Sequence, residues 1–151
     1  MATAAVCNER RMNIQLNMEL IGSQITVSRL AINKITQQMT DASEFVTSCS
    51  QQEINTFTSD ILHLCIEIDG LEKHFVDIAQ KHADCVRRIN RLYSDIMNTG
   101  YVQLQEDVDA VERASAELVR RIPTVAVRMK NMYDELFNAA SKNHPRCCCI
   151  Q

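Results

Sequence analysis

Residues 54–96 read INTFTSDILHLCIEIDGLEKHFVDIAQKHADCVRRINRLYSDI. Seam residues recur here at alternating intervals of three and four, with His82 as the strongly polar member: Ile54, Phe57, Ile61, Leu64, Ile68, Leu71, Phe75, Ile78, His82, Cys85, Ile89, Leu92 and Ile96. This spacing, sustained over roughly six heptads, is typical of a coiled coil. One helix of that length would measure about 65 Å, so it needs partner helices to bury its seam.

The same spacing continues on both sides of this stretch. The preceding seam comprises Ile14, Met18, Ile21, Ile25, Ser28, Ile32, Ile35, Met39, Ala42 and Val46. The following seam comprises Tyr101, Leu104, Val108, Val111, Ser115, Leu118, Ile122, Val125, Met129, Met132 and Leu136. We therefore predict an all-α fold with three long heptad-patterned helices over residues 12–48, 51–98 and 101–140. They would form an elongated coiled coil or a three-helix bundle between a flexible N-terminus (1–11) and a flexible C-terminal tail (141–151).

Local signals place the helix ends. Ser50 and Glu53 form a capping box that predicts a helix start. A turn there would fold the first segment back on the second, whereas a stutter would let one helix continue. Gly100 suits the left-handed position that follows a helix end. Pro123 predicts a kink rather than a break, because the seam keeps its phase on both sides.

Positions beside the seam indicate how many helices meet. Apolar or small residues next to it, such as Cys65, Val86, Val119 and Tyr133, widen the stripe and favour three or more helices. Ile and Leu alternate in the middle seam, which by itself favours a parallel dimer, but we give the wider stripe more weight. The first segment is rich in Gln, Asn, Thr and Ser and poor in charge, which indicates that much of that helix is covered.

Composition narrows the functional classes. The net charge is -3 and no basic cluster occurs, so nucleic-acid binding is not expected. The start of the chain lacks the apolar core of a signal peptide, and no run approaches a membrane span, so we expect a cytoplasmic protein. The scattered cysteines Cys7, Cys49, Cys65 and Cys85 would then be free thiols.

The last four residues, Cys148-Cys149-Ile150-Gln151, match the C-a-a-X prenylation box, and the final Gln favours a farnesyl group. Prenylation needs a thiol near a free C-terminus on a flexible approach, which Pro145 would provide. Cys147 could carry a palmitoyl group as a second anchor, since one lipid chain gives only marginal membrane residence. A tail that is only palmitoylated, and geranylgeranyl groups on neighbouring cysteines, are the alternatives.

No catalytic motif or substrate pocket is recognisable, so we expect no enzyme, no cofactor and no small-molecule substrate. His82 and Cys85 occupy successive seam positions, and a zinc site built from two copies is conceivable. We prefer to interpret His82 as a polar core layer that sets the register, with no metal bound.

Three functions fit these observations. The first is a lipid-anchored scaffold subunit on the cytosolic face of a membrane, assembled with other coiled-coil proteins as a homo- or hetero-oligomer. The second is a self-contained spectrin-like three-helix adaptor. A SNARE-type fusion protein is disfavoured, because Gln15, Gln24, Gln37 and Gln38 all miss the seam. The residues expected to carry the interaction are Ile25, Ile32, Ile61, Leu64, Ile68, Leu71, Phe75, His82, Ile89, Leu92, Leu118, Met129 and Met132.

Two stretches, IPTVAVRMKNMY at 122–133 and RRINRLY at 87–93, resemble small helical subunits of complexes for lysosome-related organelle biogenesis and lysosome positioning, notably the cappuccino type. The resemblance implies heteromeric helix bundling in endolysosomal trafficking, on the cytosolic surface of endosomes or lysosomes.

Overall fold

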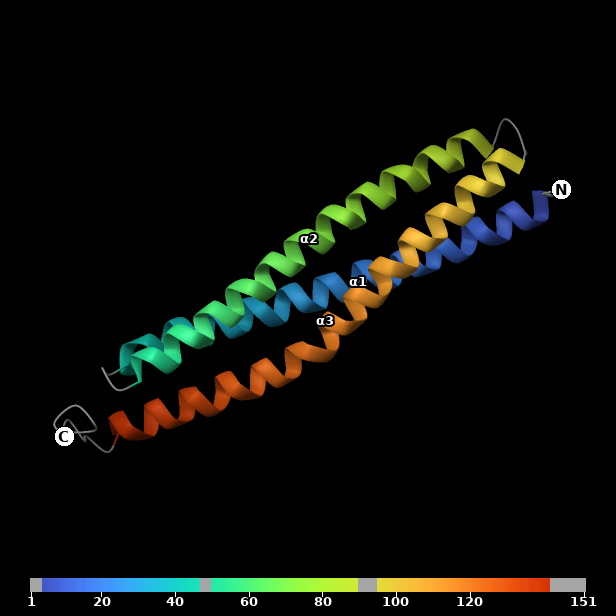
Figure 1. Cartoon of the computed structure of the whole chain (residues 1–151). Coiled ribbons are helices and arrows are strands. Elements are labelled where there is room, and N and C mark those ends of the chain that lie inside the picture. The colour runs from blue at the N-terminus through green and yellow to red at the C-terminus, as the bar shows by residue number, and fades with distance from the viewer. Residues whose placement is uncertain (1–3, 47–49, 90–94, 142–151) are drawn as a thin grey trace. The chain divides into compact units, whose positions relative to one another are not determined.

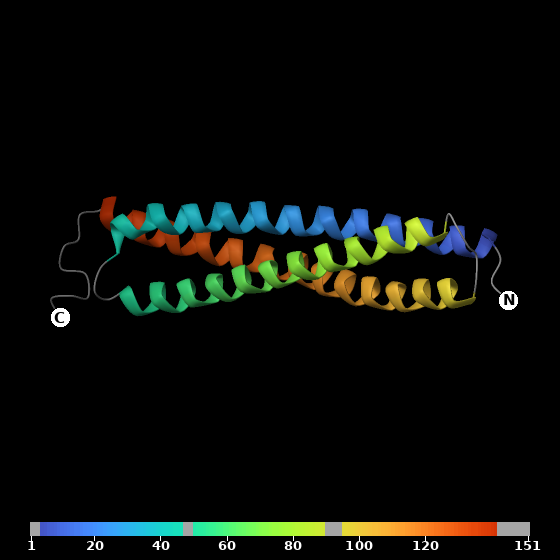
Figure 2. The ribbon, with the colours of Figure 1, turned by 90° about the horizontal axis from the view of Figure 1, so that it is seen from above.

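The computed structural model describes residues 4–46, 50–89 and 95–141, and helices account for almost all of them. Helix α1 spans Ala4–Ala42, the short 3-10 helix η1 spans Ser43–Phe45, α2 spans Gln51–Ile89 and α3 spans Asp95–Ser141 (Figure 1). No strand occurs in these described ranges, and the turned view in Figure 2 shows the same three long helical ribbons. The predicted all-α fold with three long helices is confirmed.

Helix α1 begins at Ala4, so the prediction of a flexible N-terminus is wrong for residues 4–11. Cys7, one heptad before Ile14, is fully buried and extends the seam into this stretch. We missed it because Arg10 and Arg11 occupy the next seam interval, where an apolar residue was expected.

The turn between the first two helices is real, and the alternative of one continuous helix is wrong. Helix α1 ends at Ala42, sooner than the predicted residue 48, and after η1 the backbone of Val46 is extended. Helix α2 starts at Gln51, and the carbonyl of Ser50 accepts the N–H of Ile54 at 3.0 Å. Ser50 therefore occupies the N-cap position that the capping box predicts.

The predicted end of the middle helix at Gly100 is wrong. Helix α2 ends at Ile89, and Gly100 lies inside α3, as does Ile96, which we had assigned to the middle helix. Gly100 also lacks the positive φ of a left-handed helix cap. A glycine inside a helix costs only about 0.5–1 kcal/mol, so its presence alone does not end one.

Helix α3 continues through Pro123 and runs to Ser141, so Pro123 does not break it. Pro123 is exposed, and the carbonyl that loses its helical donor is that of Val119, a half-buried residue. The kink remains a prediction.

The chain divides into two compact units, each built from parts of all three helices. Unit 1 comprises Met1–Thr26 and Asp69–Val119, and unit 2 comprises Val27–Ile68 and Arg120–Gln151. The large side chains in each core contribute about 1.5–3 kcal/mol apiece when fully buried.

The core of unit 1 is formed by seam residues of α1, α2 and α3. The buried residues are Cys7, Ile14, Met18, Ile21, Ile25, Ile78, His82, Tyr101, Leu104, Val108, Val111, Ser115 and Leu118. Gly22 belongs to this core as a close-approach site, because a Cβ there would lie 3.4 Å from Cζ of Phe75.

The core of unit 2 follows the same pattern. Its buried residues are Ser28, Ile32, Ile35, Ala42, Ile54, Phe57, Ile61, Leu64, Ile68, Ile122, Met129 and Met132. The Thr58 hydroxyl donates to Sδ of Met39 at 3.2 Å, which brings α2 beside α1 after the turn. Phe45 of η1 makes edge-on ring contacts with Tyr133 and Phe137, at centroid distances of 6.1 and 5.6 Å.

Candidate interaction site

The predicted interaction residues lie mostly inside the chain's own helical cores. In unit 1, Ile25, His82 and Leu118 are buried, and Leu71 and Phe75 are half-buried. In unit 2 the buried members are Ile32, Ile61, Leu64, Ile68, Met129 and Met132. A seam covered by its own chain is not free to meet another protein, so any partner of this folded form must contact a different surface.

Two of the predicted interaction residues lie at or beyond the limit of the described residues. Ile89 is the last residue of α2, and Leu92 lies outside the described residues.

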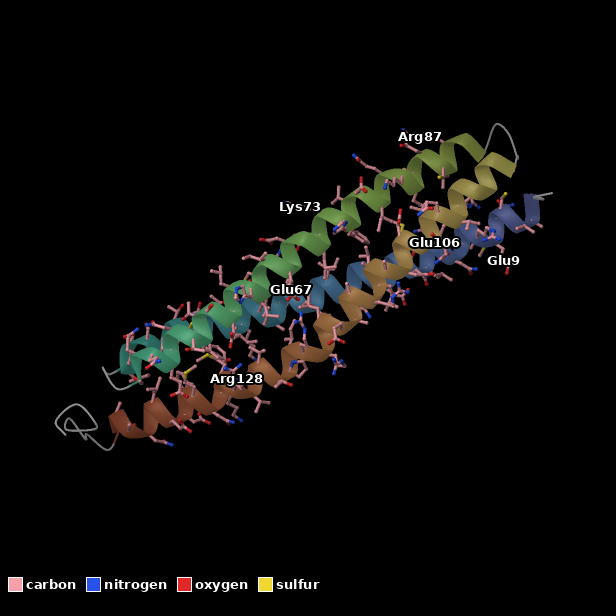
Figure 3. All side chains as sticks on the ribbon, in the orientation of Figure 1. Glu9, Glu67, Lys73, Arg87, Glu106 and Arg128 are labelled. Carbon is pink, nitrogen blue, oxygen red and sulfur yellow. The ribbon has the colours of Figure 1, made fainter. Side chains whose placement is uncertain are left out.

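A ladder of opposite charges links α2 to α3. In unit 2, Nη1 of Arg128 lies 3.2 Å from Oδ2 of Asp60, and Arg121 pairs with Glu67. One member of each pair, Arg128 and Glu67, is labelled in Figure 3. Glu67 lies seven residues after Asp60 on α2, whereas its partner Arg121 lies seven residues before Arg128 on α3. The two helices are therefore antiparallel in this unit. We call these pairs, together with Lys81–Asp107, the charge ladder.

In unit 1, Nζ of Lys81 lies 4.0 Å from Oδ2 of Asp107, at the same heptad register as the pairs in unit 2. The order of signs is reversed there, because α2 supplies the base and α3 the acid. Exposed pairs of this kind contribute about 0–1 kcal/mol each, so their main effect is to select one register. Sequence reasoning missed the ladder, although the heptad spacing of acids on α2 and bases on α3 could have revealed it.

The groove-lining residues of the two units include members of the same ladder. In unit 1 a groove is lined by His74, Lys81 and Asp107 together with apolar residues. In unit 2 a groove is lined by Asp60, Glu67, Arg121, Arg128 and their neighbours. The guanidinium of Arg128 also lies 5.3 Å from the ring centroid of Phe57, a cation–π geometry.

Ser115 forms a polar layer in the core of unit 1. Its hydroxyl donates to Oε1 of Gln24 at 2.5 Å, with the carbonyl of Glu112, 3.0 Å from the same Oγ, as the other acceptor within reach. Gln24 lies one residue off the seam, so the spacing argument left it out. In unit 2, by contrast, the Oγ of Ser28 is buried without a hydrogen-bond partner.

His82 is the second polar layer of unit 1. It is 8% exposed, and its Nε2 is buried without a hydrogen-bond partner. Burial lowers the pKa of His82 below its ordinary value of 6.5, a backbone hydrogen bond with Arg11 opposes the shift, and the charge of Arg11 adds to it. The neutral imidazole is thus favoured in the folded chain.

The described residues contain no group of three or more His, Cys, Asp or Glu side chains placed to hold a metal ion. His82 and Cys85 therefore lack further ligands within this part of the chain. Likewise, no helix of the described ranges has the length and apolarity needed to cross a membrane. Cys147 and Cys148, the predicted lipid sites, lie outside the described residues.

No protein-family model, curated protein or solved structure matches this chain.

Proposed function

We propose that this protein is a non-enzymatic coiled-coil scaffold or adaptor subunit, anchored to the cytosolic face of a membrane by a prenyl group on Cys148. The observation that carries the proposal is the box Cys148-Cys149-Ile150-Gln151, which follows a helical region with a wide apolar stripe. A palmitoyl group on Cys147 would supply the second anchor that stable membrane residence requires. The resemblance to small lysosome-related subunits supports a role in endolysosomal trafficking with other helical proteins.

Expression in cells with an N-terminal tag tests the anchor. We expect the parent chain in the membrane fraction, with a prenyl mass on its C-terminal peptide, and the Cys148→Ser variant in the soluble fraction. The Cys149→Ser variant is the matched control, because it removes a neighbouring thiol and leaves the prenylated position in place. If Cys148→Ser stayed on membranes as fully as the parent, the prenyl anchor would be ruled out.

Affinity capture of the intact chain tests the subunit role. We expect other coiled-coil proteins among the captured partners, recovered from the membrane fraction with the parent chain. Capture that returned no helical partner would remove the scaffold-subunit interpretation.

The alternative is a self-contained, spectrin-like three-helix adaptor. The observation that favours it is the coverage of the seam by the chain's own helices in both units. Expressed alone, such an adaptor should be highly helical and unfold cooperatively, whereas an isolated subunit should aggregate or melt over a broad temperature range. A SNARE-type function ranks last, because Gln15, Gln24, Gln37 and Gln38 all miss the seam.

A further inference from the structure

The outward face of α1 is apolar. The α1 outer stripe consists of Met12, Leu16, Leu20, Ser23, Val27 and Leu30, and the five large members are 44–63% exposed. Its members from Leu16 onward each lie two residues beyond a core residue, about 200° around the helix from the seam. All six lie on the single helix α1, whose periodicity puts them on one side.

The corresponding positions of α2 and α3 carry more charged and fewer large apolar side chains than those of α1. On α2 they include Lys73, Asp77 and Asp84, which are exposed. On α3 they include Glu106 and Arg113, also exposed; Lys73 and Glu106 are labelled in Figure 3. The positions on α2 are uncharged from Thr56 to Gly70, but Ile66 is the one large apolar side chain among them, and Val127 is the one on the described part of α3. Among the described residues, only α1 therefore carries several large apolar side chains at this class of position.

The surroundings of the stripe are also poor in charge. Between Met12 and Asn33 the only charged residues are Glu19 and Arg29. An extended apolar patch of this kind on a folded surface marks an interaction site, whereas scattered apolar residues do not. Uncharged polar neighbours lower the cost of removing the surface from water.

The charges at the two ends of the stripe identify the occupant. Glu9 and Lys34 continue the outward series at either end, both are exposed, and they carry opposite signs. Two copies of α1 packed antiparallel would set Glu9 of each beside Lys34 of the other, and Leu16 beside Val27. A parallel pair would set like charges together.

We propose that the chain forms a two-fold dimer in which the outer stripes of two α1 helices pack antiparallel. Such an interface is self-complementary, as two-fold symmetry requires. The proposal goes beyond the function proposed above and does not depend on lipidation of Cys148. Because the stripe is a single helix face, we expect a dissociation constant on the order of micromolar.

Sedimentation velocity of the full chain made in bacteria, where no prenyl group is added, tests the dimer between about 1 and 200 µM. Leu20→Glu puts a charge at the centre of the stripe and should weaken the dimer about tenfold or more, with unchanged circular dichroism. Val127→Glu is the matched control: it makes the same change at an outward position of α3 that is 59% exposed, and should leave the dimer intact. If Leu20→Glu disturbs the helix content, the neutral Leu20→Gln takes its place.

Charge exchange tests the orientation. Glu9→Lys and Lys34→Glu should each weaken the dimer, because each homodimer then pairs like charges. An equimolar mixture of the two variants should restore dimerisation, since both end pairs are again opposite. The proposal is overturned if the parent chain is monomeric throughout the range, if Leu20→Glu and Val127→Glu behave alike, or if the mixture fails to restore the dimer. A chain that is monomeric alone but binds another helical protein through the stripe would also overturn it.

Discussion

Replacing the helical glycines by alanine gives a quantitative test of the helix boundaries. Gly70 lies in α2 and Gly100 in α3, and a Cβ at either position would meet no atom within 4 Å. Alanine in a helix interior is favoured over glycine by about 0.5–1 kcal/mol, so each substitution should raise the free energy of unfolding by that amount. The double variant should gain about 1–2 kcal/mol if the sites act independently.

Gly22 supplies an internal comparison. A Cβ there would lie 3.4 Å from Cζ of Phe75, so this half-buried ring would have to accommodate the new methyl group. We therefore expect Gly22→Ala to gain less than Gly70→Ala, even though both positions are helical.

Urea denaturation followed by far-UV circular dichroism measures these differences. For a chain of this size, a gain of 1 kcal/mol corresponds to a rise in Tm of about 2–4 °C, so thermal melts should agree. A left-handed Gly100 at a helix end would reverse the sign, because an L-residue there costs about 1–2 kcal/mol. A stabilising Gly70→Ala together with a destabilising Gly100→Ala would show that α3 does not extend through residue 100.

Three further substitutions test the cores and the helix interior. The pKa of His82 is lowered on folding, so its contribution to stability is fully present above pH 6.5 and is lost as the pH falls through 6.5 toward the folded-state value. His82→Leu should therefore reduce the loss of stability at acid pH, measured by urea titrations at several pH values. A variant whose stability depends on pH as the parent's does would contradict this assignment. Leu118→Ala should lower the free energy of unfolding by about 2–5 kcal/mol in chemical denaturation. Leu62→Ala, at a position 59% exposed, should lower it by less than about 0.5 kcal/mol. Equal losses of stability would refute the assigned burial of Leu118. Pro123→Ala restores a helical donor at an exposed site and should stabilise the chain by up to about 3 kcal/mol, and a loss in thermal melts would count against a continuous α3.

The helix faces were predictable because side-chain spacing maps directly onto one side of a helix. Every seam residue whose side chain is described is buried or half-buried, including the polar Ser28 and Ser115. The two helix ends at Ala42 and Ile89 were not predictable, because the energies that favour a cap or a turn are about 1 kcal/mol and packing outweighs them.

Contacts between helices lay beyond the spacing argument for a different reason. Gln24 joins the core layer of Ser115 although it lies off the seam, since a long side chain reaches inward from beside it. The Arg121–Glu67 pair depends on which helices are neighbours and on their direction, which a single-helix pattern does not contain. The low charge of the first segment predicts that much of that helix is covered, whereas the structure leaves the outer stripe of α1 exposed.

The division into two units has a consequence for how such a protein can change over time. Each unit draws on two separated stretches of chain, so neither is a contiguous segment that could be copied, exchanged or inserted elsewhere as a cassette. A single crossover in the coding sequence between residues 26 and 69 would split unit 1 between two parents. Unlike tandem repeats, which lengthen by duplicating one module, this architecture can be inherited only as a whole.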